Sequence, residues 1–192
     1  AMYGQLRRAV PPDSLRNSVP GFERWGFGLK AGYRQEQDYA ELSIFHGEDK
    51  AESLPELPEA ADLFPEENIA FGISLGKGLW QKVALQTEWA LSALTRDTRS
   101  DVLASNENSW GGLFTPRTST AYYQAWKAGV QYLMESYTVG VGYERIEPGY
   151  TTHGAYFFNN DLENYTVNAT ATWWGGKINA SANGGIQRDN LD

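Results

Sequence analysis

Residues 164–187 alternate between apolar and small polar side chains, and the alternation repeats on both sides of one Gly-Gly pair. The apolar positions are Tyr165, Val167, Ala169, Ala171 and Trp173 before the glycines, and Ile178, Ala180, Ala182 and Ile186 after them. Thr, Asn and Ser occupy most positions in between. Because successive strand side chains point to opposite faces, this pattern predicts a β-hairpin with one apolar and one polar face.

The same alternation recurs in six earlier segments. They are residues 24–34, 38–46, 68–76, 81–93, 122–132 and 137–145. Together with the two halves of the hairpin, they predict eight strands within residues 24–188, after an irregular segment at residues 1–23. A chain of 192 residues is long enough for a single domain, which we expect to cover residues 1–192.

The connections between these segments are alternately short and long. Three long ones cover approximately residues 47–67, 94–121 and 146–163, whereas the others are three to five residues such as MES and WGGK. Strict alternation places the short turns at one end of the strands and the long loops at the other, which is the layout of outer-membrane barrels. The predicted fold is therefore all-β, an antiparallel up-and-down transmembrane β-barrel.

The polar positions distinguish a membrane barrel from a soluble, lipocalin-like barrel, which would turn its polar side chains to bulk water. They hold mainly Gly, Ser, Thr, Asn and Gln, as an enclosed polar interior would. The charged residues expected to face this lumen are Lys30, Glu41, Lys82, Glu88, Lys127, Glu144 and Lys177. Their opposite signs nearly cancel, so that they can pair across the interior.

Aromatic residues gather toward both ends of the predicted strands. Trp80, Tyr132, Tyr137, Trp173 and Trp174 lie toward the short turns, and Trp25, Tyr143 and Tyr165 lie toward the long loops. Two interfacial aromatic girdles would have this distribution, although aromatic residues also favour strands in general.

The predicted topology places both ends of the chain on the extracellular side if the short turns are periplasmic. Small closed barrels usually keep both ends in the periplasm, so one of two explanations is needed. Either these residues are a section of a wider barrel, or one strand has been missed, for example in residues 1–12.

Composition and charge exclude several classes of function. The net charge of −8 argues against a nucleic-acid partner, which needs clustered Lys and Arg. The chain has no cysteine, which excludes disulfides and cysteine-based zinc sites. It has no apolar run long enough for a spanning helix, and its first residues do not resemble a signal peptide.

Few residues suggest catalysis or metal binding. His46 and His153 stand in no recognisable catalytic motif, so we expect no enzyme activity, metal or cofactor. The acidic segment 48–68 lacks the spacing of a calcium loop and fits a solvated surface loop, with a short helix around 56–63. In the third long loop, Tyr150, Tyr156, Phe157 and Phe158 are candidates for a lumen plug or a partner contact, and an internally packed cap is the alternative.

Residues 144–168 (ERIEPGYTTHGAYFFNNDLENYTVN) and 183–192 (NGGIQRDNLD) resemble a largely uncharacterised group of Bacteroidota outer-membrane β-barrel proteins. The resemblance extends less clearly to residues 114–132 and implies location in the outer membrane of a Gram-negative bacterium, in contact with outer-membrane lipid.

Three functions are compatible with the predicted barrel. The first is a passive or gated channel for small hydrophilic solutes; the second is a non-conducting barrel among membrane-protein partners in a transport or secretion complex; the third is a soluble ligand-binding barrel.

Overall fold

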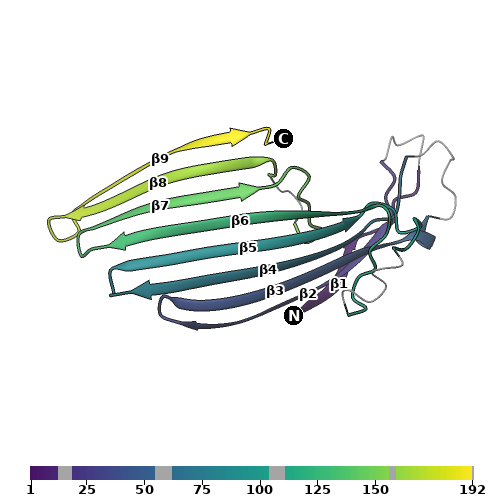
Figure 1. The fold of residues 1–192 in the computed structure, drawn as a ribbon, viewed down its shortest axis with the longest axis horizontal. Helices are drawn as coiled ribbons and strands as arrows, with labels where there is room; N and C mark the ends of the chain where they lie inside the picture. Colours follow the sequence, from purple (N-terminus) through teal and green to yellow (C-terminus); the bar gives the residue numbers. More distant parts are fainter. Residues whose placement is uncertain (13–18, 55–61, 104–110, 156–158, 192) are drawn as a thin grey trace.

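A computed structural model describes residues 1–12, 19–54, 62–103, 111–155 and 159–191. They form one sheet of nine antiparallel strands, each paired with the next in sequence (Figure 1). The strands are β1 (Met2–Arg7), β2 (Glu23–Gln35), β3 (Asp38–Lys50), β4 (Glu67–Leu79), β5 (Val83–Thr95), β6 (Thr120–Leu133), β7 (Tyr137–Ile146), β8 (Leu162–Trp173) and β9 (Ile178–Asp189). One 3-10 helix, η1 (Ala51–Ser53), follows β3. The predicted all-β, up-and-down architecture and its eight strands are confirmed.

Strand β1 corrects the expectation that residues 1–23 are irregular. It pairs with the first half of β2, from Met2 opposite Gly28 to Arg7 opposite Arg24, with a register shift near the end of β1. The six residues of β1 are mostly exposed, and their alternation of apolar and polar side chains is too short to predict a strand from the sequence alone. Only the pairing with β2 defines them as a strand. A strand within residues 1–12 is thus present, but it does not bring both edge strands' free ends together, because β9 still runs toward the end of the sheet where the long connections lie.

The sheet is open. β1 and β9 form its two edges and lie on opposite sides of the view in Figure 1. Within the described ranges, no residue of β1 pairs with β9. The described residues therefore form an open sheet and not a closed barrel.

The connections confirm the alternation of short and long. Turns of two to four residues join β2 to β3, β4 to β5, β6 to β7 and β8 to β9 at one end of the sheet. The long connections before β2, β4, β6 and β8 all lie at the other end (Figure 1). We call these the turn end and the loop end. The helix expected around 56–63 falls largely on residues outside the described ranges.

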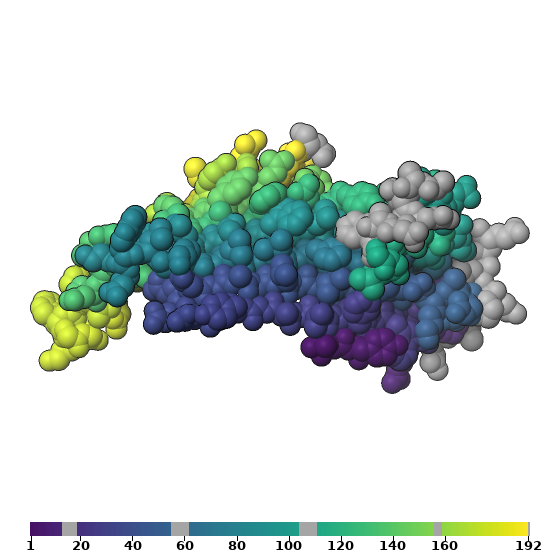
Figure 2. Space-filling view, turned by 60° about the horizontal axis from the view of Figure 1, so that its bottom comes forward, coloured from purple at the N-terminus to yellow at the C-terminus, as the bar shows by residue number. Residues whose placement is uncertain are grey.

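The hairpins are staggered along the sheet. One row of paired residues, the Lys127 row, crosses eight strands through Gly32, Glu41, Ser74, Glu88, Lys127, Glu144, Asn164 and Gln187. Beyond this row, β2, β4, β6 and β8 continue for three, five, six and nine residues before they end. The β8–β9 turn projects farthest in Figures 1 and 2. From β2 to β8 this extension grows by six residues, each about 3.3 Å long, while the sheet advances by six strand spacings of about 4.8 Å. The ratio corresponds to a strand tilt of about 35°.

Paired residues share a face of the sheet, so the register assigns every strand position to one of two faces. The polar face contains the Lys127 row and every second residue from it along each strand. The apolar face contains the positions in between.

Near the loop end, the apolar face carries a small core of Ile69, Ala93 and Phe114, against which Ile44 and Phe71 pack. Phe114 comes from the β5–β6 connection, so this long loop folds back onto the sheet.

Candidate functional site

The polar face gathers most of the charged residues that were predicted to face a lumen. Glu41, Glu88, Lys127 and Glu144 all lie in the Lys127 row. Lys30 lies two residues from this row, and its Nζ is 2.9 Å from a carboxylate oxygen of Glu41. These five side chains, which come from β2, β3, β5, β6 and β7, therefore share one surface.

Lys82 and Lys177 are not on strands. Lys82 lies in the turn between β4 and β5, and Lys177 lies in the turn between β8 and β9. The β4–β5 turn covers residues 80–82 instead of the predicted connection at residues 77–80, because Trp80 and Gln81 adopt positive φ angles. Lys177 lies in the predicted WGGK turn, where Trp174 also has a positive φ angle. Both lysines are thus at the turn end, away from the Lys127 row.

Close packing on the polar face accounts for its small residues. A Cβ atom at Gly129 would lie 2.8 Å from Gln86 Nε2, and one at Gly140 would lie 2.6 Å from Asn168 Oδ1. Both distances are shorter than a carbon normally tolerates. Glycine at these positions lets the polar side chains of the neighbouring strands lie flat across the face.

The β7–β8 connection folds onto the polar face at the loop end. Tyr150 is only 5% exposed and forms a cluster with Ile146 and Leu162. Ala90, Tyr123 and Ala125 pack against this cluster. Ala90, Ala125, Ile146 and Leu162 are cross-strand partners in a single row of the polar face. The structure therefore places Tyr150 on this face, whereas Tyr156, Phe157 and Phe158 lie outside the described residues.

The same connection reaches farther across the face to β3 and β4 through His153. The backbone N–H of His153 donates to Asn68 Oδ1 over 3.0 Å. Its ring Nδ1 lies 3.2 Å from the Gly47 carbonyl oxygen, and its Nε2 lies 3.3 Å from Glu66 Oε2. Asn68 is itself held by its Nδ2, which donates to Ser92 Oγ over 2.8 Å. These contacts fix residues 147–155 of the connection, which we call the loop cap, over the loop end of the polar face.

An ionic cluster continues from the loop cap to the first strands. Glu66 accepts from Arg24 Nη2 over 2.8 Å, and Arg24 Nε donates to Asp49 over 2.7 Å. Asp49 is 3% exposed and also accepts from Arg7 Nη2 over 3.1 Å and from the backbone N–H of Glu66. This cluster was missed because its members are far apart in sequence and carry no motif. The one available signal was the presence of charged residues at the ends of predicted strands.

We expect the attachment of the loop cap to weaken in acid. Burial raises the pKa of Glu66, but the hydrogen bond and charge of His153, together with Arg24, outweigh it and lower the pKa from 4.5 to about 2. A carboxyl group whose pKa is depressed by folding contributes stability above pH 4.5, and that contribution is lost as the pH falls to about 2.

The Glu66→Gln variant tests this dependence. At neutral pH its unfolding midpoint is expected below that of the wild type, and the two midpoints should converge between pH 4.5 and about 2. Glu52→Gln, on the exposed part of η1, serves as the control and should follow the wild type throughout. A difference between wild type and Glu66→Gln that stays constant over this range would contradict the assignment.

The predicted girdle residues divide between the two ends of the apolar face. Trp25, Tyr143 and Tyr165 lie toward the loop end, and the Tyr143 and Tyr165 rings are 5.1 Å apart. Tyr132, Tyr137 and Trp173 lie toward the turn end, and Trp80 lies in a turn. The distribution is not purely peripheral, because Trp89 and Trp126 form a pair, 5.9 Å apart, between these ends.

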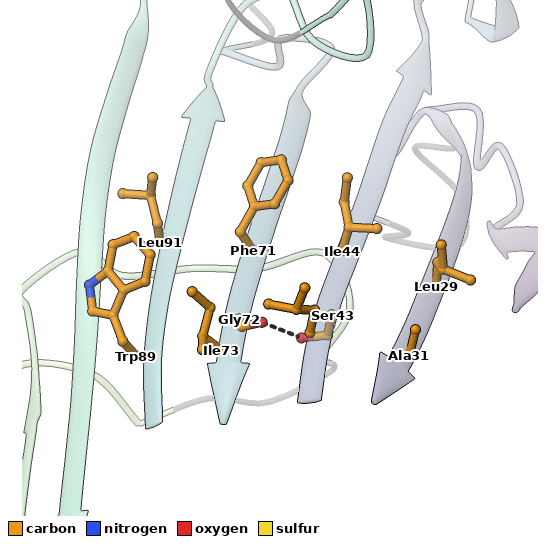
Figure 3. Close-up of a pocket in the computed structure, with 10 residues that line it drawn as sticks. Leu29, Ala31, Ser43, Ile44, Phe71, Gly72, Ile73, Trp89 and Leu91 are labelled. Carbon is orange, nitrogen blue, oxygen red and sulfur yellow. Dashed lines mark hydrogen bonds between the residues drawn. The ribbon is translucent and has the colours of Figure 1, made fainter. Parts of the chain in front are cut away.

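A hollow of about 540 Å³ lies on the apolar face over β2–β5 (Figure 3). Its walls are Leu29, Ala31, Leu42, Ile44, Phe71, Ile73, Trp89 and Leu91. Ser43 and Gly72 also line the hollow, although both are polar-face positions, and the Ser43 hydroxyl lies 3.5 Å from the Gly72 carbonyl oxygen. The lining is thus almost wholly apolar.

No protein-family model, curated protein or solved structure matches this chain. Among the described residues, no helix is long and apolar enough to cross a membrane. In the same part of the chain, no three His, Asp or Glu side chains are grouped as metal ligands. The features of the described residues that bear on function are therefore the two faces of the sheet and the loop cap.

Proposed function

We propose that this chain forms part of the wall of an outer-membrane β-barrel, with its apolar face toward lipid and its polar face toward the lumen. The observation that carries the proposal is the apolar face of β7–β9. From the turn end up to Tyr143, Tyr165 and Ile186, this face holds no charged residue. The next row holds a charged residue on every strand, namely Arg145, Glu163 and Arg188.

The height of this uncharged region supports a membrane environment. On β8 it extends from Tyr165 to Trp173, which at about 3.3 Å per residue is about 26 Å along the strand. A strand tilt of about 35° reduces this to about 22 Å along the membrane normal, close to the apolar band of about 25 Å in outer-membrane barrels. The stagger of the hairpins supports the same tilt, which lies in the range found for barrels.

Many apolar-face side chains are also exposed. Leu42 is 61%, Val141 53%, Val167 54% and Ile186 71% exposed. Burial in lipid would remove these side chains from water, whereas a soluble sheet would leave them in it.

Strand direction supports a wider barrel. All eight pairs are antiparallel, so β1 and β9 both run toward the loop end. A ring of these nine strands alone would join its two edges in parallel, whereas bacterial barrels have an even number of antiparallel strands. We therefore propose that an odd number of further strands completes the wall.

The function that this geometry supports best is a channel for small hydrophilic solutes. The Lys127 row would line the lumen with one cation among three carboxylates, those of Glu41, Glu88 and Glu144. Lys30 and Arg34 pair with Glu41 on the same face, so Glu88, Lys127 and Glu144 leave one net negative charge in the row, which favours cations. Single-channel recording in planar bilayers tests the proposal directly, and stable insertion without conductance would exclude the channel.

Lys127→Glu is expected to increase the preference for cations by removing the one cation of the row. The reversal potential in a KCl gradient measures this preference. Lys77→Glu, at the turn end of the apolar face, is the matched control and should leave the reversal potential unchanged. An unchanged potential in Lys127→Glu would contradict a lumen-facing Lys127 row.

The loop cap favours a second candidate, a non-conducting barrel in a membrane complex. With Tyr150 and His153 held against the polar face, the cap would narrow the lumen at the loop end. Insertion without conductance, together with stoichiometric partners in mild detergent, would support this candidate. A chain that remains in solution without detergent would support the soluble alternative.

A further inference from the structure

Three charged residues form one row across neighbouring strands of the apolar face. Arg145 on β7 pairs with Glu163 on β8, which pairs with Arg188 on β9. Tyr143 and Tyr165 lie in the adjacent apolar row on the turn side. The row is thus the point at which the apolar face of these strands becomes charged.

Glu163 organises the two arginines. Its side chain is only 8% exposed, and its Oε1 accepts from the Tyr143 hydroxyl over 2.9 Å. Arg145 Nη1 lies 3.9 Å from Oε1, and Arg188 Nη1 lies 3.4 Å from Oε2. The carboxylate therefore holds one guanidinium on each side, two strands apart.

Both guanidiniums remain accessible to a further acceptor. The side chain of Arg145 is 42% exposed and that of Arg188 is 69% exposed. A guanidinium carries five N–H donors, and Glu163 engages one terminal nitrogen of each arginine. One carboxylate between two guanidiniums also leaves a local positive charge on a chain whose net charge is −8.

We propose that Arg145 and Arg188 bind the phosphate groups of lipid A, the anionic lipid of the outer leaflet. The inference rests on the proposed function and on an orientation with the short turns in the periplasm, which together would place the loop end outside the cell and this row at the level of the headgroups. Guanidiniums recognise phosphate oxygens through two parallel N–H···O bonds, and Tyr is suited to the membrane interface. Below the row, Val141, Val167 and Ile186 provide an apolar surface for the acyl chains.

A purely structural role, in which the arginines only neutralise Glu163, explains their arrangement less well. If they served only to neutralise Glu163, a single cation would be enough, and greater burial of both would be expected. The two remain partly exposed on either side of the carboxylate. An acceptor with more than one anionic group fits this arrangement.

The full chain is to be inserted into phosphatidylcholine vesicles with and without a minor fraction of lipid A. Binding is measured as lipid A retained by the repurified protein and as the rise in its unfolding temperature. The wild type is expected to retain lipid A, and the Arg145→Gln/Arg188→Gln variant to bind it about tenfold or more weakly. Lys77→Gln/Lys82→Gln, which removes two cations at the turn end, should bind like the wild type.

A second variant separates binding from folding, because the double variant leaves Glu163 without its two cations. Glu163→Gln keeps both arginines and removes the competing carboxylate, so it should bind lipid A at least as tightly as the wild type. Equal loss of binding in Glu163→Gln and in the double variant would overturn the proposal, since the row would then be purely structural.

Three further outcomes would overturn the proposal. Equal retention of phosphatidylglycerol in place of lipid A would show a general anionic-lipid surface rather than a lipid A site. Normal insertion with equal lipid A binding by wild type and double variant would reject this site alone. Failure of the wild type to insert into any vesicle would reject the membrane function as well.

Discussion

Replacing Asp49 by asparagine is expected to lower the free energy of unfolding by about 3 kcal/mol, because one partner of a buried ionic cluster is removed. The Asp49 side chain is 1% exposed and faces Arg24, which is 13% exposed, and Arg7, which is 42% exposed. Asparagine keeps the shape of the side chain but loses the charge that both guanidiniums require. Arg24 would retain Glu66 as a partner, which limits the loss.

Urea unfolding of the detergent-refolded chain, followed by the fluorescence of its seven tryptophans, measures this effect. Asp38→Asn is the matched control, because Asp38 pairs with Lys77 at the exposed turn end, where the side chains are 42% and 60% exposed. An exposed pair contributes less than about 1 kcal/mol, so this variant should unfold close to the wild type. Equal midpoints for Asp49→Asn and Asp38→Asn would show that the cluster does not stabilise the loop end.

Replacing Ala169 by arginine is expected to cost about 2–4 kcal/mol and to reduce insertion into vesicles, since Ala169 would lie near the bilayer midplane. It is halfway between Tyr165 and Trp173, at the two ends of the uncharged region on β8. Its cross-strand neighbours on the apolar face are Val139 and Ala182. A guanidinium here would have no partner and no water.

Thr170→Arg provides the matched control on the adjacent residue. Thr170 lies on the polar face between Thr138 and Ser181, where small side chains leave room for an arginine. We expect its insertion and stability to stay near wild type, because its side chain would face an aqueous lumen. The heat-dependent shift in gel mobility of the refolded protein measures insertion for both variants. The opposite order, with Thr170→Arg the more damaging, would reverse the assignment of the two faces.

Local sequence predicted the strands well because each extends for ten or more residues with a sharp alternation. Residues 164–173 are an example, since the apolar and polar positions of β8 follow directly from the period of two. Strand β1 could not be found in this way, because its six residues become a strand only through pairing with β2. The alternation does not fix the ends of the strands either, because Lys82 continues the pattern of residues 81–93 but lies in the β4–β5 turn.

The loop cap illustrates a second limit. Sequence identified residues 146–163 as a long aromatic loop, and Tyr150 as a candidate for a plug, a contact or a cap. It could not identify the partners of Tyr150 and His153, because Ala90, Gly47 and Glu66 lie about 60 or more residues away in the chain. Contacts of that kind depend on the order and register of all the intervening strands.

The sequence by itself determined the all-β class, the eight long strands, the alternation of turns and loops, and which residues of each strand share a face. These features follow from the two-residue period and from local turn chemistry, which need no tertiary contact. Only the tertiary structure decided the register that aligns the Lys127 row, the stagger that tilts the strands and the ionic cluster around Asp49. It also decided that the sheet of described residues is open, because pairing between strands is set by contacts that no single segment contains.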